Sequence, residues 1–198
     1  MKYLLSLLAL TAPAFPQTAE DPGPHPVGWE DVVFPDPSGG TLEARLFYPA
    51  VANGQSTAAD PGAGPFPLVA FLHRYLGDAA DYDLLSTHIA SWGFFVASID
   101  TQTGGPATMK KEARDSADML NWVAAESTDP VSPYFAMVAP GPWGAVGHSM
   151  GGGALFYLIE DDPNVQVLVA STNQFPGHTG EWYEGLYYIQ GSELVQVP

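Results

Sequence analysis

The stretch GHSMG, residues 147–151, decides the fold of this chain. The apolar run WGAV at 143–146 comes before it and is typical of a buried strand, while GGALFYLI at 152–159 comes after it and is typical of a helix. A serine at the tip of a tight strand-to-helix turn needs neighbours without side chains, and a glycine stands two residues to either side of Ser149. The pattern therefore predicts a strand, a sharp turn that carries Ser149, and a helix.

Ser149 is the candidate nucleophile of this turn. A helix that begins beside the serine directs backbone N–H groups and the positive end of its dipole toward the space where an acyl oxyanion forms. The N–H of Met150 is one expected donor. The alternative for the same residues is a plain glycine-rich loop, because a G-x-S-x-G pattern also arises by chance in glycine-rich chains.

The composition indicates one folded domain without a nucleic-acid partner. The chain has 198 residues, of which 46% are hydrophobic and 12% aromatic, enough for one sizeable core. Its 22 acidic and 6 basic residues give a net charge of −16, whereas phosphate binding needs clustered lysine and arginine. The same charge disfavours an anionic membrane surface, and it suits either solubility or a salty habitat.

Residues 1–19 are predicted to be a signal peptide with its cleavage region. One lysine precedes the apolar run at 4–10, and the small-residue stretch at 12–14 follows it. The run is too short to cross a bilayer, so we expect a secreted protein, extracellular or periplasmic, without stable membrane insertion. A buried N-terminal helix is the alternative. Because the chain has no cysteine, no disulfide stabilises it outside the cell.

The remainder is predicted to be a short linker followed by one domain. Residues 20–27 are proline-rich and are expected to link the signal peptide to a domain that covers 28–198. Two strand-like stretches, 30–34 and 42–48, are separated by turn formers and predict a hairpin.

Strands and helices alternate after this hairpin. Apolar runs typical of strands buried on both faces occupy 68–72, 94–99, 165–170 and 186–190. Helical spacing of apolar residues predicts helices over about 82–92 and 108–126. The other, polar face of the second helix carries Lys110, Lys111, Glu112, Arg114 and Asp115. This alternation predicts an α/β fold, a mostly parallel twisted sheet with helices on both faces.

Three stretches together resemble the α/β-hydrolase superfamily. They are FLHRYLG at 71–77, HIASWGFFV at 88–96 and GHSMGGG at 147–153. Within the superfamily they are similar to secreted serine esterases: cutinase-like polyester hydrolases of the PET hydrolase type, platelet-activating-factor acetylhydrolases and chlorophyllases. The resemblance covers about residues 28–191 and implies the α/β-hydrolase fold.

The resemblance implies roles for several residues. Ser149 would be the nucleophile, the N–H groups of Tyr75 and Met150 would form the oxyanion hole, and the Tyr75 ring would line the acyl pocket. Phe175 and Trp182 are further candidates for an aromatic substrate-binding wall, with ordinary loop packing as the alternative. We expect no cofactor and no metal, since motifs for phosphate, dinucleotide or metal binding are missing.

The sequence departs from the family pattern at the acid and the base. In this fold the order along the chain is serine, then acid, then histidine. Val195 occupies the position of the family's aspartate, and Glu193 substitutes for it only if the loop is re-registered. The one histidine after the serine is His178, either a replacement base or a plain surface-loop residue. The family's own histidine would follow the end of this sequence, so we expect a domain that is C-terminally incomplete after the strand at 186–190.

Other residues near the expected site have structural interpretations. Arg74 stands where the family has glycine, and its side chain either crowds the oxyanion loop or points to solvent. His73 and His148 are expected to be packed structural histidines, and His88 a partly exposed one.

The sequence thus predicts a secreted serine carboxylic-ester hydrolase, polyester hydrolase-like, cutinase-like or lipase-like, that acts through an acyl-enzyme on Ser149. Its expected partner is an ester or polyester substrate. The alternative is a truncated or non-catalytic α/β-hydrolase-like binding module that lacks the acid and the histidine of the triad. No motif indicates the identity of the substrate or the oligomeric state.

Overall fold

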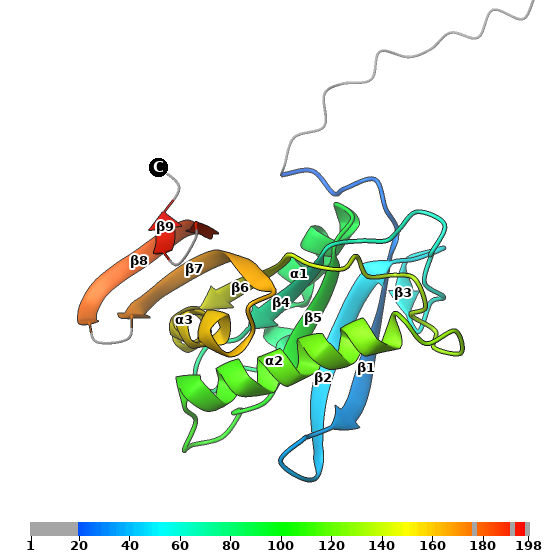
Figure 1. The fold of residues 1–198 in the computed structure, drawn as a ribbon. Helices are drawn as coiled ribbons and strands as arrows, with labels where there is room; N and C mark the ends of the chain where they lie inside the picture. The colour runs from blue at the N-terminus through cyan, green and yellow to red at the C-terminus, as the bar shows by residue number, and fades with distance from the viewer. Residues whose placement is uncertain (1–19, 176–177, 191–192, 197–198) are drawn as a thin grey trace, which may run out of the picture.

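The structure, a computed structural model, describes residues 20–175, 178–190 and 193–196, with side chains described within 20–171. The described strands form a mixed sheet in the order β3-β1-β2-β5-β4-β6-β7-β8-β9 (Figure 1). The strands are β1 Val27–Pro35, β2 Thr41–Pro49, β3 Gly54–Gln55, β4 Leu68–Leu72, β5 Phe95–Asp100, β6 Trp143–His148, β7 Val165–Phe175, β8 His178–Gln190 and β9 Glu193–Gln196. The helices are the short η1 Ala79–Tyr82, α1 Asp83–Ser91, α2 Met109–Glu126 and α3 Met150–Asp161.

The N-terminal part of the sheet contains the predicted antiparallel hairpin. β1 and β2 pair along their whole length. In the turn between them, Asp36 accepts hydrogen bonds from the backbone N–H and the hydroxyl of Ser38, and Gly39 and Gly40 have positive φ. The turn formers between two strand-like stretches therefore reverse the chain as expected.

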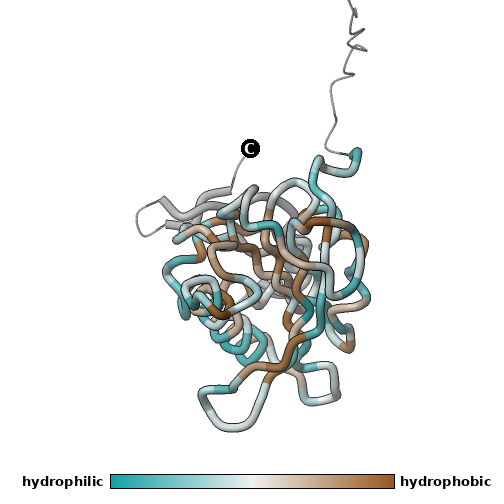
Figure 2. Tube along the Cα trace, turned by 90° about the vertical axis from the view of Figure 1, so that its right-hand side faces the viewer, coloured by the Kyte–Doolittle hydropathy of each residue, from teal (hydrophilic) through white to brown (hydrophobic). Residues whose placement is uncertain are grey.

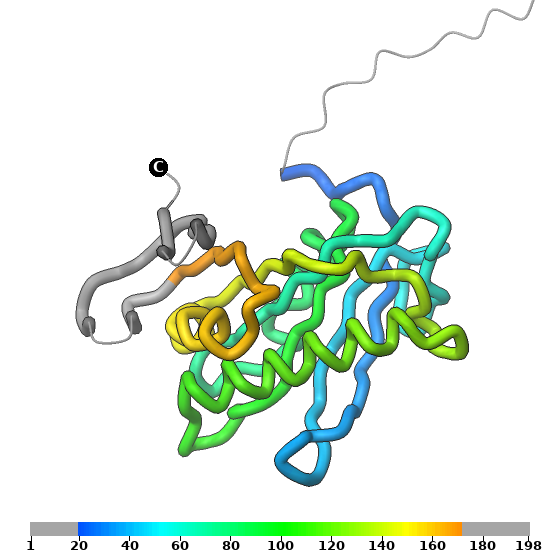
Figure 3. The backbone as a smooth tube through the Cα atoms, in the orientation of Figure 1, coloured from blue at the N-terminus to red at the C-terminus, as the bar shows by residue number. Residues whose placement is uncertain are grey.

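The centre of the sheet is parallel. β4 pairs in parallel with β5 and β6, and β6 pairs in parallel with β7. Successive strands of this part are joined through helices, as parallel connections require, and the chain leaves β6, passes through α3 and returns to β7 (Figure 3). The structure confirms the predicted mostly parallel α/β sheet.

The strand β4 shows how the two faces of the sheet are divided. All five of its side chains are buried. Leu68, Ala70 and Leu72 belong to the core shared with α2 and α3, whereas Val69 and Phe71 belong to the core shared with α1. α2 and α3 therefore cover one face and α1 the other (Figure 1). Hydrophobic segments run through the middle of the molecule, and the outer turns are mostly hydrophilic (Figure 2).

The C-terminal strands differ from the prediction. The sequence predicted a loop between a strand at 165–170 and a last strand at 186–190, but β8 begins at His178 and runs antiparallel to β7. A further strand, β9, pairs with β8, so the sheet does not stop at 190. Only two residues separate β7 from β8, too few for the crossover of a parallel connection. An apolar run predicts a strand but not its direction.

The proline-rich segment before β1 is bonded to the domain. The N–H of Gly23 donates to the hydroxyl of Ser91 at 2.7 Å, and the N–H of His25 donates to the Ser91 carbonyl at 3.1 Å. β1 begins at Val27, one residue before the predicted start of the domain, and this side chain is buried. Gly23 and His25 keep donors that their proline neighbours lack, and these donors attach the segment to the end of α1.

Candidate active site

Ser149 occupies the turn between β6 and α3, as the sequence predicted. Its backbone has φ 54° and ψ −114°, a conformation that residues with a side chain rarely adopt. A Cβ added to Gly147 would lie 2.5 Å from the carbonyl oxygen of Gly151, and one added to Gly151 would collide with the carbonyl of Leu72. The half-buried Ser149 is therefore held at a sharp turn that only these two glycines allow.

Backbone hydrogen bonds fix this turn to its neighbours. The N–H of Ser149 donates to Ser171 in β7 at 2.7 Å, and the N–H of Gly151 donates to His73 at 3.0 Å. Met150 is the first residue of α3, where a backbone N–H has no acceptor within the helix. The Met150 N–H is thus placed at the positive end of α3 directly after Ser149.

The loop after β4 lies beside this turn, because its residue His73 accepts from Gly151. Within the loop, the N–H of Gly77 donates to Arg74 at 2.9 Å, and Leu76 has φ 56°. The Tyr75 side chain is 44% exposed, and its hydroxyl donates to the carbonyl of Gly105 at 2.8 Å. The structure therefore brings the two predicted oxyanion-hole residues, Tyr75 and Met150, onto adjoining segments.

Arg74 runs along the outside of this loop. Its guanidinium pairs with Asp81 at 2.8 Å and donates to the carbonyl of Tyr75 at 3.2 Å. The side chain is 44% exposed. Of the two orientations considered from the sequence, the arginine adopts the one that faces solvent.

Tyr82 connects the loop to the turn. Its hydroxyl accepts a hydrogen bond from the N–H of Arg74 at 3.2 Å and lies 2.8 Å from Nδ1 of His148. Its ring packs on Phe71 with 4.6 Å between centroids. Burial raises the pKa of the Tyr82 hydroxyl. His148 is thus packed against Tyr82, which agrees with its structural interpretation.

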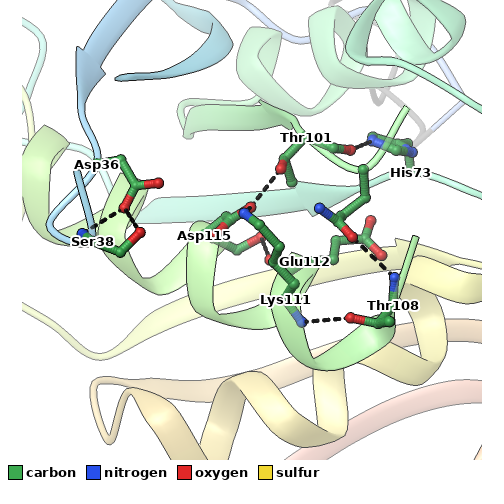
Figure 4. Close-up of polar contacts among 10 residues, drawn as sticks. Asp36, Ser38, His73, Thr101, Thr108, Lys111, Glu112 and Asp115 are labelled. Atoms are coloured by element: carbon green, nitrogen blue, oxygen red, sulfur yellow. Dashed lines mark hydrogen bonds and ion pairs between the residues drawn. The ribbon is translucent and has the colours of Figure 1, made fainter. Parts of the chain in front are cut away.

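His73 is buried beneath the same loop. Its Nδ1 lies 2.7 Å from the carbonyl oxygen of Arg74 and its Nε2 lies 2.7 Å from that of Thr101. Thr101 directly follows β5, so the ring joins the ends of two central strands. Thr101 continues the network, because its hydroxyl donates to Asp115 of α2 at 2.5 Å (Figure 4).

Two acidic residues of α2 are buried, although the sequence placed both on the helix's polar face. Asp115 accepts from Thr101 and, at 2.6 Å, from Lys111. Glu112 has no exposed surface, and neither of its carboxyl oxygens has a hydrogen-bond partner among the described residues. Burial and the nearby Asp115 raise the pKa of Glu112 to about 8.

The helical pattern of α2 indicates that Glu112 is buried once polar residues are included in the stripe. Glu112 shares a stripe at helical spacing with Ser116, Met119 and Val123, all of which are buried. The polar residue types concealed this stripe, and the predicted apolar stripe beside it was therefore too narrow.

The remaining candidates lie in the C-terminal strands, where side chains are outside the described residues. Phe175 ends β7 and pairs with His178 at the start of β8, which also contains Trp182. Glu193 and Val195 lie in β9. Phe175 follows Ser171, the acceptor of the Ser149 N–H, by four positions in β7, so this strand continues past the turn.

Two cavities of the described part lie away from the turn. One, of about 700 Å³, is formed by segment 22–27 with β1 and α1. The other is an apolar groove of about 500 Å³ between α1 and strands β4, β6 and β7, and its lining includes Leu85, Ile89, Val167 and Val169. Ser149 lines neither, so neither is the substrate cleft expected beside it.

The described residues contain neither a membrane-spanning helix nor a candidate metal site. None of the helices in this part of the chain is long and apolar enough to cross a bilayer. Among the side chains that the structure describes, no three His, Asp or Glu residues are grouped so that they could hold a metal ion.

A solved structure has a similar fold, and a family model matches the sequence. The fold is similar to that of a ferulic acid esterase from Streptomyces cinnamoneus, with a TM-score of 0.60 and 19% sequence identity, over 79% of this chain. The chain spans 62% of the length of that esterase. No curated protein matches the sequence. The family model of PET hydrolase-like proteins matches residues 12–184. The chain therefore belongs to the PET hydrolase-like family and has an α/β-hydrolase fold.

Proposed function

We propose that the chain is a secreted serine carboxylic-ester hydrolase in which Ser149 is the nucleophile. The observation that carries this proposal is the strained turn, which holds a serine with φ 54° at the N-terminus of α3. Backbone strain of this kind persists only where the surrounding structure enforces it, and such strained residues cluster at active sites. Family membership supports an ester as substrate.

The proposed reaction has two halves. Ser149 Oγ attacks the ester carbonyl carbon, its proton passes to the leaving alcohol through a base, and an acyl-enzyme forms. Water then attacks the acyl carbonyl carbon, the bond from this carbon to Ser149 Oγ breaks, the carboxylic acid leaves and the serine hydroxyl regains its proton. The N–H groups of Tyr75 and Met150 would bind the negative oxygen of each tetrahedral intermediate. Met150 supports this role, because its N–H lies at the start of α3.

The substrate class proposed is a carboxylic ester or polyester. The half-exposed ring of Tyr75 would form one apolar wall beside Ser149. Phe175 and Trp182 would supply others from β7 and β8. Secretion rests on the signal-like pattern of residues 1–19.

A serine hydroxyl needs a base to become a useful nucleophile. Both ring nitrogens of His73 face carbonyl oxygens, and His148 Nδ1 faces the Tyr82 hydroxyl. Because these ring nitrogens already have hydrogen-bond partners, the contacts support the second candidate function, a module that binds an ester without hydrolysing it. His178 and Glu193 are the candidate base and acid that this chain offers beyond Ser149.

Hydrolysis of a short p-nitrophenyl ester by the purified chain separates the two functions. The proposed enzyme releases p-nitrophenol, reacts with a fluorophosphonate at Ser149, and loses both reactions in Ser149→Ala. A matched Ser38→Ala variant, in the exposed β1–β2 turn, should keep both. Ester binding by a chain that shows no Ser149-dependent release would instead support the non-catalytic module.

A further inference from the structure

We propose that the hydroxyl of Tyr82 is a positioning group for the oxyanion hole, because it joins the loop that carries Tyr75 to the turn that carries Ser149. The inference rests on the function proposed above and adds to it a residue outside the serine and its two backbone donors.

The hydroxyl contacts a direct neighbour of each reacting segment. The N–H of Arg74 donates to Tyr82 Oη at 3.2 Å, and Arg74 immediately precedes Tyr75. On the other side, Nδ1 of His148 lies 2.8 Å from the same oxygen, and His148 immediately precedes Ser149. One oxygen atom therefore bridges Arg74 and His148, which lie 74 positions apart in the sequence.

The direction of these hydrogen bonds follows from the donors available. Since the Arg74 N–H donates to the oxygen, the hydroxyl can direct its own proton to Nδ1 of His148, and the remaining imidazole proton then lies on Nε2. Burial raises the pKa of Tyr82, which keeps this proton on the hydroxyl near neutral pH. Each of the two hydrogen bonds of the Tyr82 hydroxyl therefore pairs one donor with one acceptor.

The ring that carries the hydroxyl is itself held in place. It packs on Phe71 of β4 at 4.6 Å between centroids and meets the edge of the His148 ring at 6.0 Å, with 67° between the two ring planes. A second link, from the Gly151 N–H to the His73 carbonyl at 3.0 Å, joins the same two segments at the base of the loop. The two links together attach the loop to the turn at two points.

Loss of such a bridge should lower the rate of ester hydrolysis more than it weakens substrate binding. Oxyanion donors interact most strongly with the charge that develops in the transition state, so a displaced donor lowers kcat and leaves KM nearly unchanged. A tyrosine that only stabilised the fold would change neither constant in the folded protein. This difference is measurable.

The test compares Tyr82→Phe with the parent chain on a short p-nitrophenyl ester. Tyr82→Phe keeps the ring on Phe71 and removes only the bridge, so we expect kcat to fall on the order of tenfold and KM to stay within about twofold. Tyr48→Phe is the matched control, because it removes a buried hydroxyl that donates to Thr57 at 3.1 Å in a distant part of the sheet. It should keep the parent kcat. Equal kcat values in Tyr82→Phe and Tyr48→Phe overturn the inference.

A second measurement does not depend on turnover. The amide hydrogen of Arg74, followed by NMR, should exchange with solvent faster in Tyr82→Phe than in the parent, and Tyr48→Phe should leave it unchanged. His148→Leu breaks the bridge from the other side and should reproduce the kcat loss if Tyr82→Phe does not fold. Unchanged exchange at Arg74 in folded Tyr82→Phe also overturns the inference.

The outcomes separate the two proposals. Hydrolysis that depends on Ser149 but not on Tyr82 refutes the bridge and leaves the proposed function standing. A parent chain without any Ser149-dependent hydrolysis refutes the proposed function and, with it, this role of Tyr82.

Discussion

Ser149 and Glu112 are two strained groups of opposite kinds. Ser149 carries backbone strain, and its cause is local: the glycines at 147 and 151 are the residues whose side chains the turn would exclude. Glu112 carries electrostatic strain, since a carboxyl group is buried without a hydrogen-bond partner among the described residues. Spacing along the chain reveals the first kind, while the second depends on which surfaces cover the helix.

Ionisation of Glu112 should make the stability of the protein depend on pH. Its pKa is raised from 4.5 to about 8, so between these values the folded protein keeps a proton that the unfolded chain releases. Stability therefore falls as pH rises through this window, by up to about 1.4 kcal/mol per pH unit from this group. In Glu112→Gln the loss of stability with rising pH should be smaller, and the variant should be more stable than the parent at pH 8.

Urea unfolding of both proteins at pH 5 and pH 8 checks this. The exposed Glu160→Gln on α3 is the control, and it should retain the parent's pH dependence. If the free energy of unfolding changed equally between pH 5 and pH 8 in the parent and in Glu112→Gln, Glu112 would not be the source of the pH dependence.

The ends of helices show how far local signals reach. Thr108 precedes α2, and its hydroxyl accepts from the N–H of Lys111 at 3.3 Å, a cap that the sequence pattern indicates by itself. Asp162 follows α3 and directly precedes Pro163. It is buried and accepts from Asn121 of α2 at 3.2 Å, a partner 41 positions away that no local pattern indicates.

Removal of the α2 cap should lower stability without affecting chemistry. We expect Thr108→Ala to reduce the free energy of unfolding by about 1 kcal/mol, because one N–H of the first turn loses its acceptor. Thr87→Ala, at an exposed position inside α1, is the control and should change stability less. Thermal denaturation of both variants measures the difference, and equal melting temperatures would argue against a capping role.

The whole sheet is covered unevenly in the described part of the chain. α2 and α3 cover one face, whereas α1 borders an apolar groove on the other. Val167 and Val169 of β7 are 39% and 43% exposed in this groove. Apolar surface of this kind favours contact with other apolar groups over water.

An apolar fluorescent dye should therefore bind the folded chain at this groove. Leu85→Glu introduces a charge into the lining and should weaken dye binding by about tenfold, since a bound apolar dye would remove water from the carboxylate without giving it a partner. Leu84→Glu places the same charge on the same helix, at a side chain that is 90% exposed and outside the groove lining. A dye titration that gives equal affinities for the two variants would exclude the groove as the binding site.

The sequence by itself determined the elements with short-range causes. These are the hairpin, the buried parallel strands, the helices between them and the glycine-cleared turn at Ser149, since apolar periodicity and turn residues act over a few positions. Only the tertiary structure decided what depends on distant partners: the antiparallel direction of β8, the burial of Glu112 and Asp115, and the Tyr82 bridge between Arg74 and His148. Burial and hydrogen bonding belong to pairs of surfaces, and one stretch of sequence specifies only one member of each pair.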